Sequence, residues 1–372
     1  MSKQVNRFAR AAIALAAFAI VTACGSVTTV SSNGVNPSTA ASAAAFGGMS
    51  GLIAAAKKEG QLNVIALPPD WANYGAIISG FTAKYGIKVN SANPNGSSQD
   101  EVNAVREQGG TSRAPDVLDI GMAVALANTA LFAPYEVAEW NDIPASQKDA
   151  NGLWYQDYGG YMSIGYDSSK FTITSVQDLL KPEFKGAVAL NGDPTKANAA
   201  LNGVMMASLA NGGSLDNIAP GVAFFHKLNQ LGNFVPIQAT TATVKNGTTP
   251  VVFDWDYLSA AHGQDVPAWK VFVPPNAVLG GYYAQAISKT APDPAAARLW
   301  EEYLYSVAGQ NLWLQGGARP VEMAAMTTAG TLNQTFAAAL PPVNGTPVFL
   351  SPSQATSAAA YLNSNWAQAI GS

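Results

Sequence analysis

Apolar side chains recur along the chain with two different periods from residue 49 onwards. Residues 52 to 59 carry them at helical spacing before Gly60, and residues 62 to 67 then form a short apolar run typical of a buried strand. The helical period returns over residues 77 to 85, and a second apolar run follows at residues 87 to 90. This order predicts a strand–helix–strand unit.

The same alternation continues towards the end of the chain. Further strands are predicted for residues 117–120, 161–166, 187–190 and 249–253, and further helices for residues 199–209 and 220–231, from Asp293-Pro294 onwards, and for residues 355–370. Strands that alternate with helices predict an α/β fold with a largely parallel sheet in each domain.

The first 24 residues have the pattern of an export signal. Three basic residues precede a charge-free apolar run over residues 11 to 21, which is shorter than the roughly 20 residues of a membrane span. Val21-Thr-Ala-Cys24 then resembles the bacterial lipobox, and Cys24 is the only cysteine in the chain. We therefore expect residues 1–23 to be removed and Cys24 to carry a lipid that anchors the protein outside the cytoplasm. An ordinary secretory signal is the alternative.

Residues 24–48 follow this signal and contain no charged side chain. Small and polar residues of this kind bury little surface, so we expect a flexible tether. Removing the three basic residues of the signal changes the net charge from −4 to −7. That charge argues against nucleic acid as a partner.

The residues that most enzymes and metal sites need are scarce. His226 and His262 are the only histidines, and neither has another histidine or a cysteine at metal-ligand spacing. Ser163 lies one residue out of step with a nucleophile elbow, and no phosphate-binding or dinucleotide-binding glycine pattern occurs. The sequence therefore predicts a protein that is not an enzyme and that has no metal ion or cofactor.

Three stretches resemble the solute-binding proteins of ABC importers, in the type 2 periplasmic-binding fold and the cluster that includes iron, polyamine and phosphonate binders. LIAAAKKEGQLNV at residues 52–64 is similar to the helix and strand with which those proteins begin. KPEFKG at residues 181–186 is similar to their entry into the second lobe. DPAAARLWEEYLYS at residues 293–306, followed by Gly309-Gln310, is similar to their returning helix.

The resemblance implies two α/β lobes joined by two crossings, with a ligand cleft between them. Lobe 1 would comprise residues 49–155 and 283–372, and lobe 2 residues 156–282. Closure of the lobes around a ligand is a hinge motion. The resemblance also implies a monomer that binds a small-molecule solute and delivers it to an ABC permease in the membrane.

Ligands of α/β sheets lie beyond the carboxyl ends of the strands, so the loops that follow each predicted strand hold the candidate ligand contacts. These candidates are Asp70, Trp71, Tyr74, Tyr158, Tyr161, Thr195, Lys196, Asn198, Asp254, Trp255, Asp256, Tyr257 and Tyr282. Several have ordinary alternatives. Asp70 is also placed to cap a helix. Tyr158 and Tyr161 suit either the lining of the cleft, with Gly159-Gly160 as a hinge between them, or a surface loop.

Asp254-Trp-Asp-Tyr257 is the strongest of these signals. In an extended segment Asp254 and Asp256 would face one way and Trp255 the other. Two carboxylates beside aromatic rings suit an ammonium group, with a cation–π contribution of about 0.5 to 2 kcal/mol per ring. Helix capping by Asp256 is the alternative.

Two further segments suggest other ligands. Thr195, Lys196 and Asn198 precede a helix whose N-terminus would suit a phosphonate or carboxylate, although capping by Asp193 or Thr195 would explain them equally. Tyr282 and Tyr283 are similar to the tyrosine pair of iron-binding members of the family, but they fall at the second crossing. An amine or polyamine is therefore the first prediction, ahead of an aminophosphonate, another organic anion or ferric ion. A structural or adhesive lipoprotein and a secreted hydrolase are the rival classes.

Overall fold

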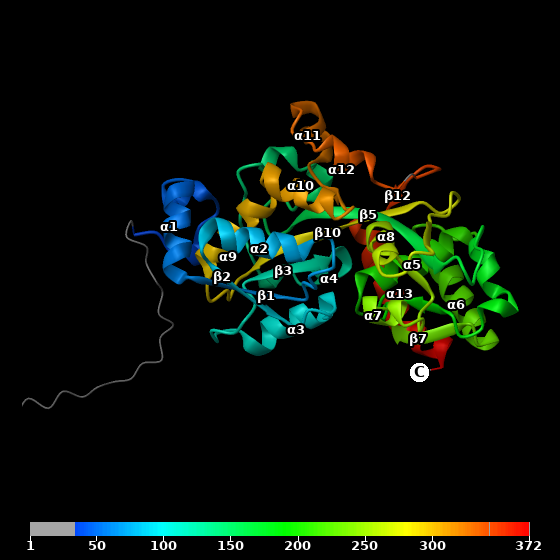
Figure 1. The fold of residues 1–372 in the computed structure, drawn as a ribbon. Coiled ribbons are helices and arrows are strands. Elements are labelled where there is room, and N and C mark those ends of the chain that lie inside the picture. The colour runs from blue at the N-terminus through cyan, green and yellow to red at the C-terminus, as the bar shows by residue number, and fades with distance from the viewer. Residues whose placement is uncertain (1–33, 342, 372) are drawn as a thin grey trace, which may run out of the picture.

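The computed structural model describes residues 34–341 and 343–371 as two lobes joined by long strands (Figure 1). The first lobe contains helices α1 (Met49–Glu59), α2 (Tyr74–Tyr85), α3 (Ser98–Gln108), α4 (Met122–Ala127), α9 (Pro294–Leu304) and α10 (Val307–Gln315), with strands β1 (Gln61–Ile65), β2 (Lys88–Ala92), β3 (Val117–Gly121) and β4 (Phe132–Ala133). None of the helices in the described residues is both long and apolar enough to cross a membrane.

The second lobe follows the same alternation of strands and helices. Its elements are β6 (Val188–Leu190), α5 (Asn198–Ala210), α6 (Ala219–Leu231), β7 (Phe234–Gln238), α7 (Thr241–Lys245), β8 (Val251–Trp255), α8 (Asp256–Ala261) and β9 (Trp269–Phe272). The chain then returns and ends with β11 (Arg319–Pro320), α11 (Met323–Ala329), α12 (Gln334–Ala338), β12 (Val348–Phe349) and α13 (Pro352–Ile370).

Strands β5 (Tyr155–Asp167) and β10 (Leu279–Ser288) connect the two lobes. They pair antiparallel with each other, β10 also pairs with β3 of lobe 1, and the second half of β5 pairs with β8 of lobe 2. One path of hydrogen-bonded strands therefore runs through both lobes, in the order β12-β10-β5-β8-β6-β7. The predicted parallel pairing is confirmed for β1 with β2 and for β6 with β7 and β8. The crossing strands are antiparallel because they carry the chain back between the lobes.

The helix ends that were predicted from a glycine are confirmed for α1 and α2. Gly60 and Gly86 follow α1 and α2 with φ of 79° and 72°, and each donates its N–H to a carbonyl of the last turn. A residue with a β-carbon is strained at such φ values, so glycine closes these helices at little cost. The chain can then turn directly into β1 and β2.

The predicted tether is wrong for residues 34–48, which fold against lobe 1. Short 3-10 helices form at Pro37–Thr39 and Ala43–Phe46, and Phe46 is 2% exposed. The buried guanidinium of Arg298 on α9 donates to the carbonyl of Ala40 at 2.6 Å. This segment lacks the apolar area to fold alone. It is ordered because the core of lobe 1 buries the Phe46 ring and Arg298 donates to its backbone.

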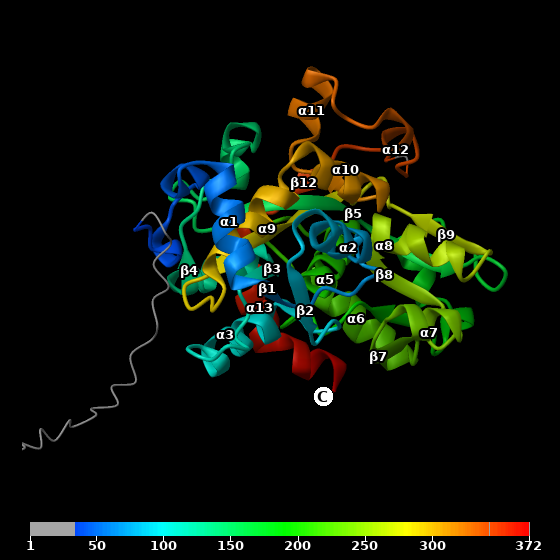
Figure 2. The same ribbon diagram turned by 60° about the vertical axis from the view of Figure 1, so that its left-hand side comes forward.

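The end of the chain departs from the predicted division into lobes, which placed residues 283–372 in lobe 1. Helix α13 packs against α6 of lobe 2 (Figure 2). It also packs against α4 of lobe 1. The Trp366 ring lies 5.6 Å from that of Phe225, and Nδ1 of His226 lies 2.6 Å from the carbonyl oxygen of Ala369. The C-terminal helix therefore contacts both lobes on the side away from α11 and α12.

Candidate ligand-binding site

A cavity of about 660 Å³ lies between the lobes. Lobe 1 contributes the loop after β1, the N-terminus of α3, Asp119 of β3 and the end of α10. Lobe 2 contributes the loops after β6 and β7 and the junction of β8 with α8. Strand ends of both lobes thus converge on one cavity, as expected for ligand sites in α/β proteins.

Six of the thirteen predicted contacts line this cavity. They are Asp70, Trp71, Lys196, Asn198, Asp254 and Tyr257. The other seven lie outside its lining: Tyr74, Tyr158, Tyr161, Thr195, Trp255, Asp256 and Tyr282. Cys24 lies outside the described residues, so its lipidation stays a prediction.

Asp254 is the last residue but one of β8 and is 3% exposed. Its Oδ2 accepts a hydrogen bond from Nδ2 of Asn191 at 2.9 Å, and its Oδ1 accepts one from the backbone N–H of Trp255 at 2.8 Å. Burial raises the pKa of this carboxyl to about 7. No ion pair to Asp254 occurs within residues 34–341 and 343–371, so its charge is supported by neutral donors alone.

Asp119 is a second buried carboxylate in the lining, and it is not among the residues predicted from the sequence. Its Oδ2 accepts hydrogen bonds from the hydroxyls of Tyr74 and Tyr158, both at 2.7 Å, while Oδ1 has no partner among the described residues. Burial raises the pKa of Asp119 and that of Glu101, which accepts from the Asp119 N–H at 3.0 Å. The available signal was an acidic residue inside the apolar run of β3.

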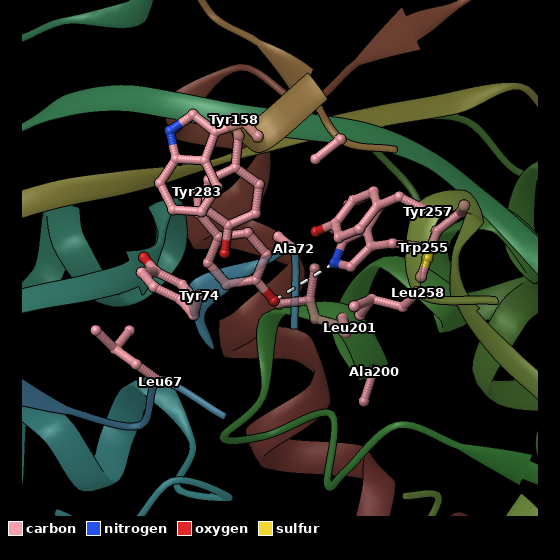
Figure 3. Close-up of a cluster of buried hydrophobic side chains, with 14 of the residues drawn as sticks. Leu67, Ala72, Tyr74, Tyr158, Ala200, Leu201, Trp255, Tyr257, Leu258 and Tyr283 are labelled. Carbon is pink, nitrogen blue, oxygen red and sulfur yellow. Dashed lines mark hydrogen bonds between the residues drawn. The ribbon is translucent and has the colours of Figure 1, made fainter. Parts of the chain in front are cut away.

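Aromatic rings from both lobes gather in one buried cluster, in which Figure 3 labels Tyr74, Tyr158, Trp255, Tyr257 and Tyr283. Trp71, Tyr257 and Tyr283 line the cavity. The rings of Tyr158 and Tyr283 stack at 5.7 Å, and Nε1 of Trp71 donates to the Tyr158 hydroxyl at 2.7 Å. Tyr74 and Tyr158 thus act behind the surface, where they hold Asp119 and Trp71.

Acidic side chains far outnumber basic ones around the cavity. Its lining includes seven carboxylates: Asp70, Asp100, Glu101, Asp119, Asp193, Asp254 and Asp265. Lys196 is the one lysine or arginine there, and its Nζ lies 3.3 Å from Asp193. Desolvation lowers the pKa of His262, which favours its neutral form. Where these carboxyls are ionised, the field in this part of the structure favours a cation.

The segment before α5 is arranged as a turn closed by Asp193. This carboxylate accepts from the backbone N–H and hydroxyl of Thr195, at 2.9 and 2.7 Å, and pairs with Lys196. Thr195 is therefore committed to the turn. Asn198 begins α5 and lies against Gly121 of lobe 1, where an added β-carbon would overlap it.

The expectation that Asp254 and Asp256 face the same way is wrong. Helix α8 begins at Asp256, so the alternation of the strand stops one residue after Asp254. Asp256 is 0% exposed, pairs with Arg319 at 2.8 Å and accepts the N–H of Tyr161 at 3.0 Å. It therefore joins α8 to β5 and β11, while the Trp255 ring packs in the core beneath the cavity.

The glycines predicted as a hinge have a packing role. Gly159 and Gly160 pair with Tyr282 and Gly281 across β5 and β10. A β-carbon on Gly160 would overlap the Asp256 carboxylate and the ring of Tyr257. Tyr161 stacks under Arg319 at 4.6 Å, so this crossing is a close-packed surface behind the cavity.

One hydrogen bond spans the mouth of the cavity. The hydroxyl of Thr241 on α7 donates to Oδ2 of Asp70 at 2.6 Å. Asp70 belongs to the loop after β1 in lobe 1, and Thr241 belongs to lobe 2. The described conformation therefore brings the lobes into polar contact at the rim.

The architecture is that of a two-lobed binding protein with a ligand cavity between its lobes. A model of the family described as bacterial extracellular solute-binding protein matches residues 115–338, which is more than half of the chain. The chain belongs to this family. Membership agrees with the export predicted from residues 1–23, which lie outside the described part of the chain.

Solved structures show the same fold at low sequence identity. Iron-bound HitA from Pseudomonas aeruginosa is 19% identical, with a TM-score of 0.62, and the match covers 84% of this chain and 99% of that one. AfuA from Actinobacillus pleuropneumoniae, with fructose-6-phosphate bound, is 16% identical, with a TM-score of 0.65 and the same coverage.

A third neighbour is a putative spermidine/putrescine ABC transporter from Listeria monocytogenes. It is 13% identical, with a TM-score of 0.61 and coverage of 83% of this chain and 98% of that one. The ligands in these names range from a metal ion to a sugar phosphate and polyamines. The shared fold is the type 2 periplasmic-binding fold, and it leaves the choice of solute to the cavity.

Proposed function

We propose that the protein is the receptor of an ABC importer and that it captures a cationic amine, such as a polyamine, for delivery to a membrane permease. The proposal rests on the buried carboxylate of Asp254. A buried carboxylate without an ion-pair partner in the described residues is costly, and an ammonium ligand would offset that cost. Under this proposal, Cys24 carries the lipid that keeps the receptor near its permease.

The rest of the lining supports the same ligand class. Trp71, Tyr257 and Tyr283 offer aromatic surface to an alkyl chain or an ammonium group. The single lysine of the lining is held by Asp193, so it adds little positive field to the cavity. The polyamine name of the Listeria neighbour is consistent with this proposal.

A zwitterion such as an aminophosphonate is the second candidate. Helix α5 points its N-terminus at the cavity through Asn198, and no side chain caps its first turn. Backbone N–H groups there would suit the anionic end of such a ligand. The amine end would still use Asp254.

The arrangement gives ferric ion less support. Tyr283 lines the cavity and Tyr282 does not, so the adjacent pair does not present two phenol groups to one ligand. Among the described residues, no group of three or more His, Cys, Asp or Glu side chains is placed to hold a metal.

Thermal unfolding in the presence of candidate solutes tests the proposal. The mature chain carrying Cys24→Ser would be measured with alkylamines and polyamines, aminophosphonates, amino acids, sugar phosphates and ferric ion. A ligand at 100 times its Kd stabilises the folded state by about 2.7 kcal/mol. We expect amines to give the largest shift and to bind more tightly as the pH rises through about 7, because the Asp254 carboxyl then ionises.

Asp254→Asn should lower the affinity for the best amine by roughly 10- to 100-fold, since hydrogen bonds to charged groups contribute about 1.5–3 kcal/mol. Asp142→Asn is the matched control, because Asp142 is exposed and lies away from the cavity. A panel without any shift would reject the transport role and favour a structural lipoprotein or a hydrolase. A shift by anions alone would reject the amine.

A further inference from the structure

The cavity presents one buried carboxylate from each lobe. Asp119 comes from β3 in lobe 1, and Asp254 comes from the end of β8 in lobe 2. They are 7% and 3% exposed, so both are more than nine-tenths buried although both line the cavity. They belong to strands that lie on opposite sides of the β5–β10 crossing.

Neither carboxylate is fully partnered. Asp119 uses Oδ2 for two tyrosine hydroxyls and leaves Oδ1 without a hydrogen bond in the described chain. Asp254 accepts one hydrogen bond at each oxygen, while an ionised carboxylate offers about four acceptor positions. The ion pairs of the described residues involve other carboxylates: Asp167, Asp178, Asp193, Asp256 and Asp265.

Two aromatic rings connect these carboxylates across the cavity. Tyr257 and Tyr283 both line it. Tyr158 donates its hydroxyl to Asp119 at 2.7 Å, and its ring stacks on that of Tyr283 at 5.7 Å. The backbone N–H of Trp255 donates to Asp254 at 2.8 Å, and Nε1 of Trp255 donates to the Tyr283 hydroxyl at 3.4 Å. Asp119 and Asp254 are therefore each separated from Tyr283 by a single residue, Tyr158 or Trp255.

We infer that the solute carries at least two cationic groups, one for Asp119 and one for Asp254, with an alkyl spacer against Tyr257 and Tyr283. This rests on the proposed amine-receptor function. A diamine would neutralise a buried carboxylate in each lobe and would connect the lobes through a single molecule. A monoamine can pair with only one of the two sites at a time.

Calorimetry with matched amines tests this inference on the mature chain carrying Cys24→Ser. The ligands are α,ω-diaminoalkanes of three to eight carbons and the n-alkylamines of the same lengths. We expect the best diamine to bind at least 100-fold more tightly than the monoamine of equal length. Asp119→Asn and Asp254→Asn should each weaken diamine binding by 10-fold or more, and Asp142→Asn should leave it unchanged.

The variants also separate two sites from one shared site. With two sites, the diamine is weakened by both substitutions, whereas the monoamine is weakened by only one of them. Equal loss of monoamine affinity in both variants would show a single ammonium between the carboxylates and would overturn the inference. Equal affinity of wild-type protein for diamine and monoamine would also overturn it, and that comparison does not depend on any variant folding.

Failure of the inference is distinguishable from failure of the proposed function. If monoamines and diamines bind equally well, the amine-receptor function stands and only the second cationic site is lost. If Asp119→Asn leaves diamine binding intact while Asp254→Asn reduces it, the second cation is bound elsewhere. If no amine binds at all, both are rejected.

Discussion

The buried carboxyl of Asp254 makes the stability of the ligand-free protein depend on pH. Burial raises its pKa from 3.8 to about 7. Because the folded-state pKa lies above the unfolded-state value, its contribution to stability is complete below about pH 4 and is lost as the pH rises through 7. At about 1.4 kcal/mol for each pH unit between the two pKa values, the loss is of the order of 4 kcal/mol.

Asp254→Asn removes the ionisation and should therefore remove this cost. The amide keeps one of the two hydrogen bonds that the carboxylate accepts, from Asn191 or the Trp255 N–H, and loses the other at about 1 kcal/mol. We expect the variant to be roughly 2–3 kcal/mol more stable than the wild type at pH 8 and slightly less stable at pH 4. Urea unfolding of both proteins, followed by tryptophan fluorescence from pH 4 to 8, measures the difference.

The difference between variant and wild type isolates this residue, because every other titrating group is common to both proteins. A stability difference that is the same at pH 4 and pH 8 would refute the reasoning, since it would mean that Asp254 titrates alike in the folded and unfolded states. Asp142→Asn removes one charge at the exposed surface and should show no such dependence.

Three further substitutions test other parts of the structure. Gly160→Ala should destabilise the protein by about 1–3 kcal/mol in urea, because its β-carbon would overlap the Asp256 carboxylate. Arg298→Lys should cost about 2–4 kcal/mol and expose residues 34–48 to limited proteolysis, because a lysine cannot reproduce the donors that hold Ala40 and its neighbours. Cys24→Ser should release the protein from the membrane fraction, as judged by immunoblotting of cell fractions.

Matched controls accompany these variants. Gly263→Ala should leave stability unchanged, because an added β-carbon there meets nothing within 4 Å. Arg113→Lys alters an exposed arginine and should leave proteolysis of residues 34–48 unchanged. If Gly160→Ala were as stable as Gly263→Ala, the packing role of the crossing glycines would be wrong. Continued membrane retention of the Cys24→Ser protein would contradict lipid anchoring through that residue.

The sequence predicted most helices and strands because their signals are local. Gly60 and Gly86 end helices through their own conformational freedom, and Pro294 begins α9 where a missing N–H costs nothing. The predicted strand over residues 161–166 was too short. The observed β5 runs from Tyr155 to Asp167, because its first half is defined by pairing with β10, more than 100 residues away in the chain.

The cavity was predictable only in part, for a similar reason. Asp254 and Tyr257 line it because they lie at the end of β8 and the start of α8, and the apolar run before them makes that position visible in the sequence. The place of Asp119 depends on Tyr74 and Tyr158, which lie 45 and 39 residues away and reach it only in the folded chain. Asp256 was wrongly predicted to face the ligand beside Asp254. Helix α8 begins at Asp256, and its side chain pairs with Arg319 instead.

The attachment of residues 34–48 has a mechanical consequence. Arg298 fixes this segment to α9, so a force applied at the N-terminus is transmitted directly to lobe 1. It reaches lobe 2 through the two crossing strands and α13, and through contacts across the cavity such as the Thr241–Asp70 hydrogen bond. In a protein held at its N-terminus, lobe 1 is therefore the stationary frame, and opening of the cavity is a swing of lobe 2 that carries Asp254 away from the anchored side.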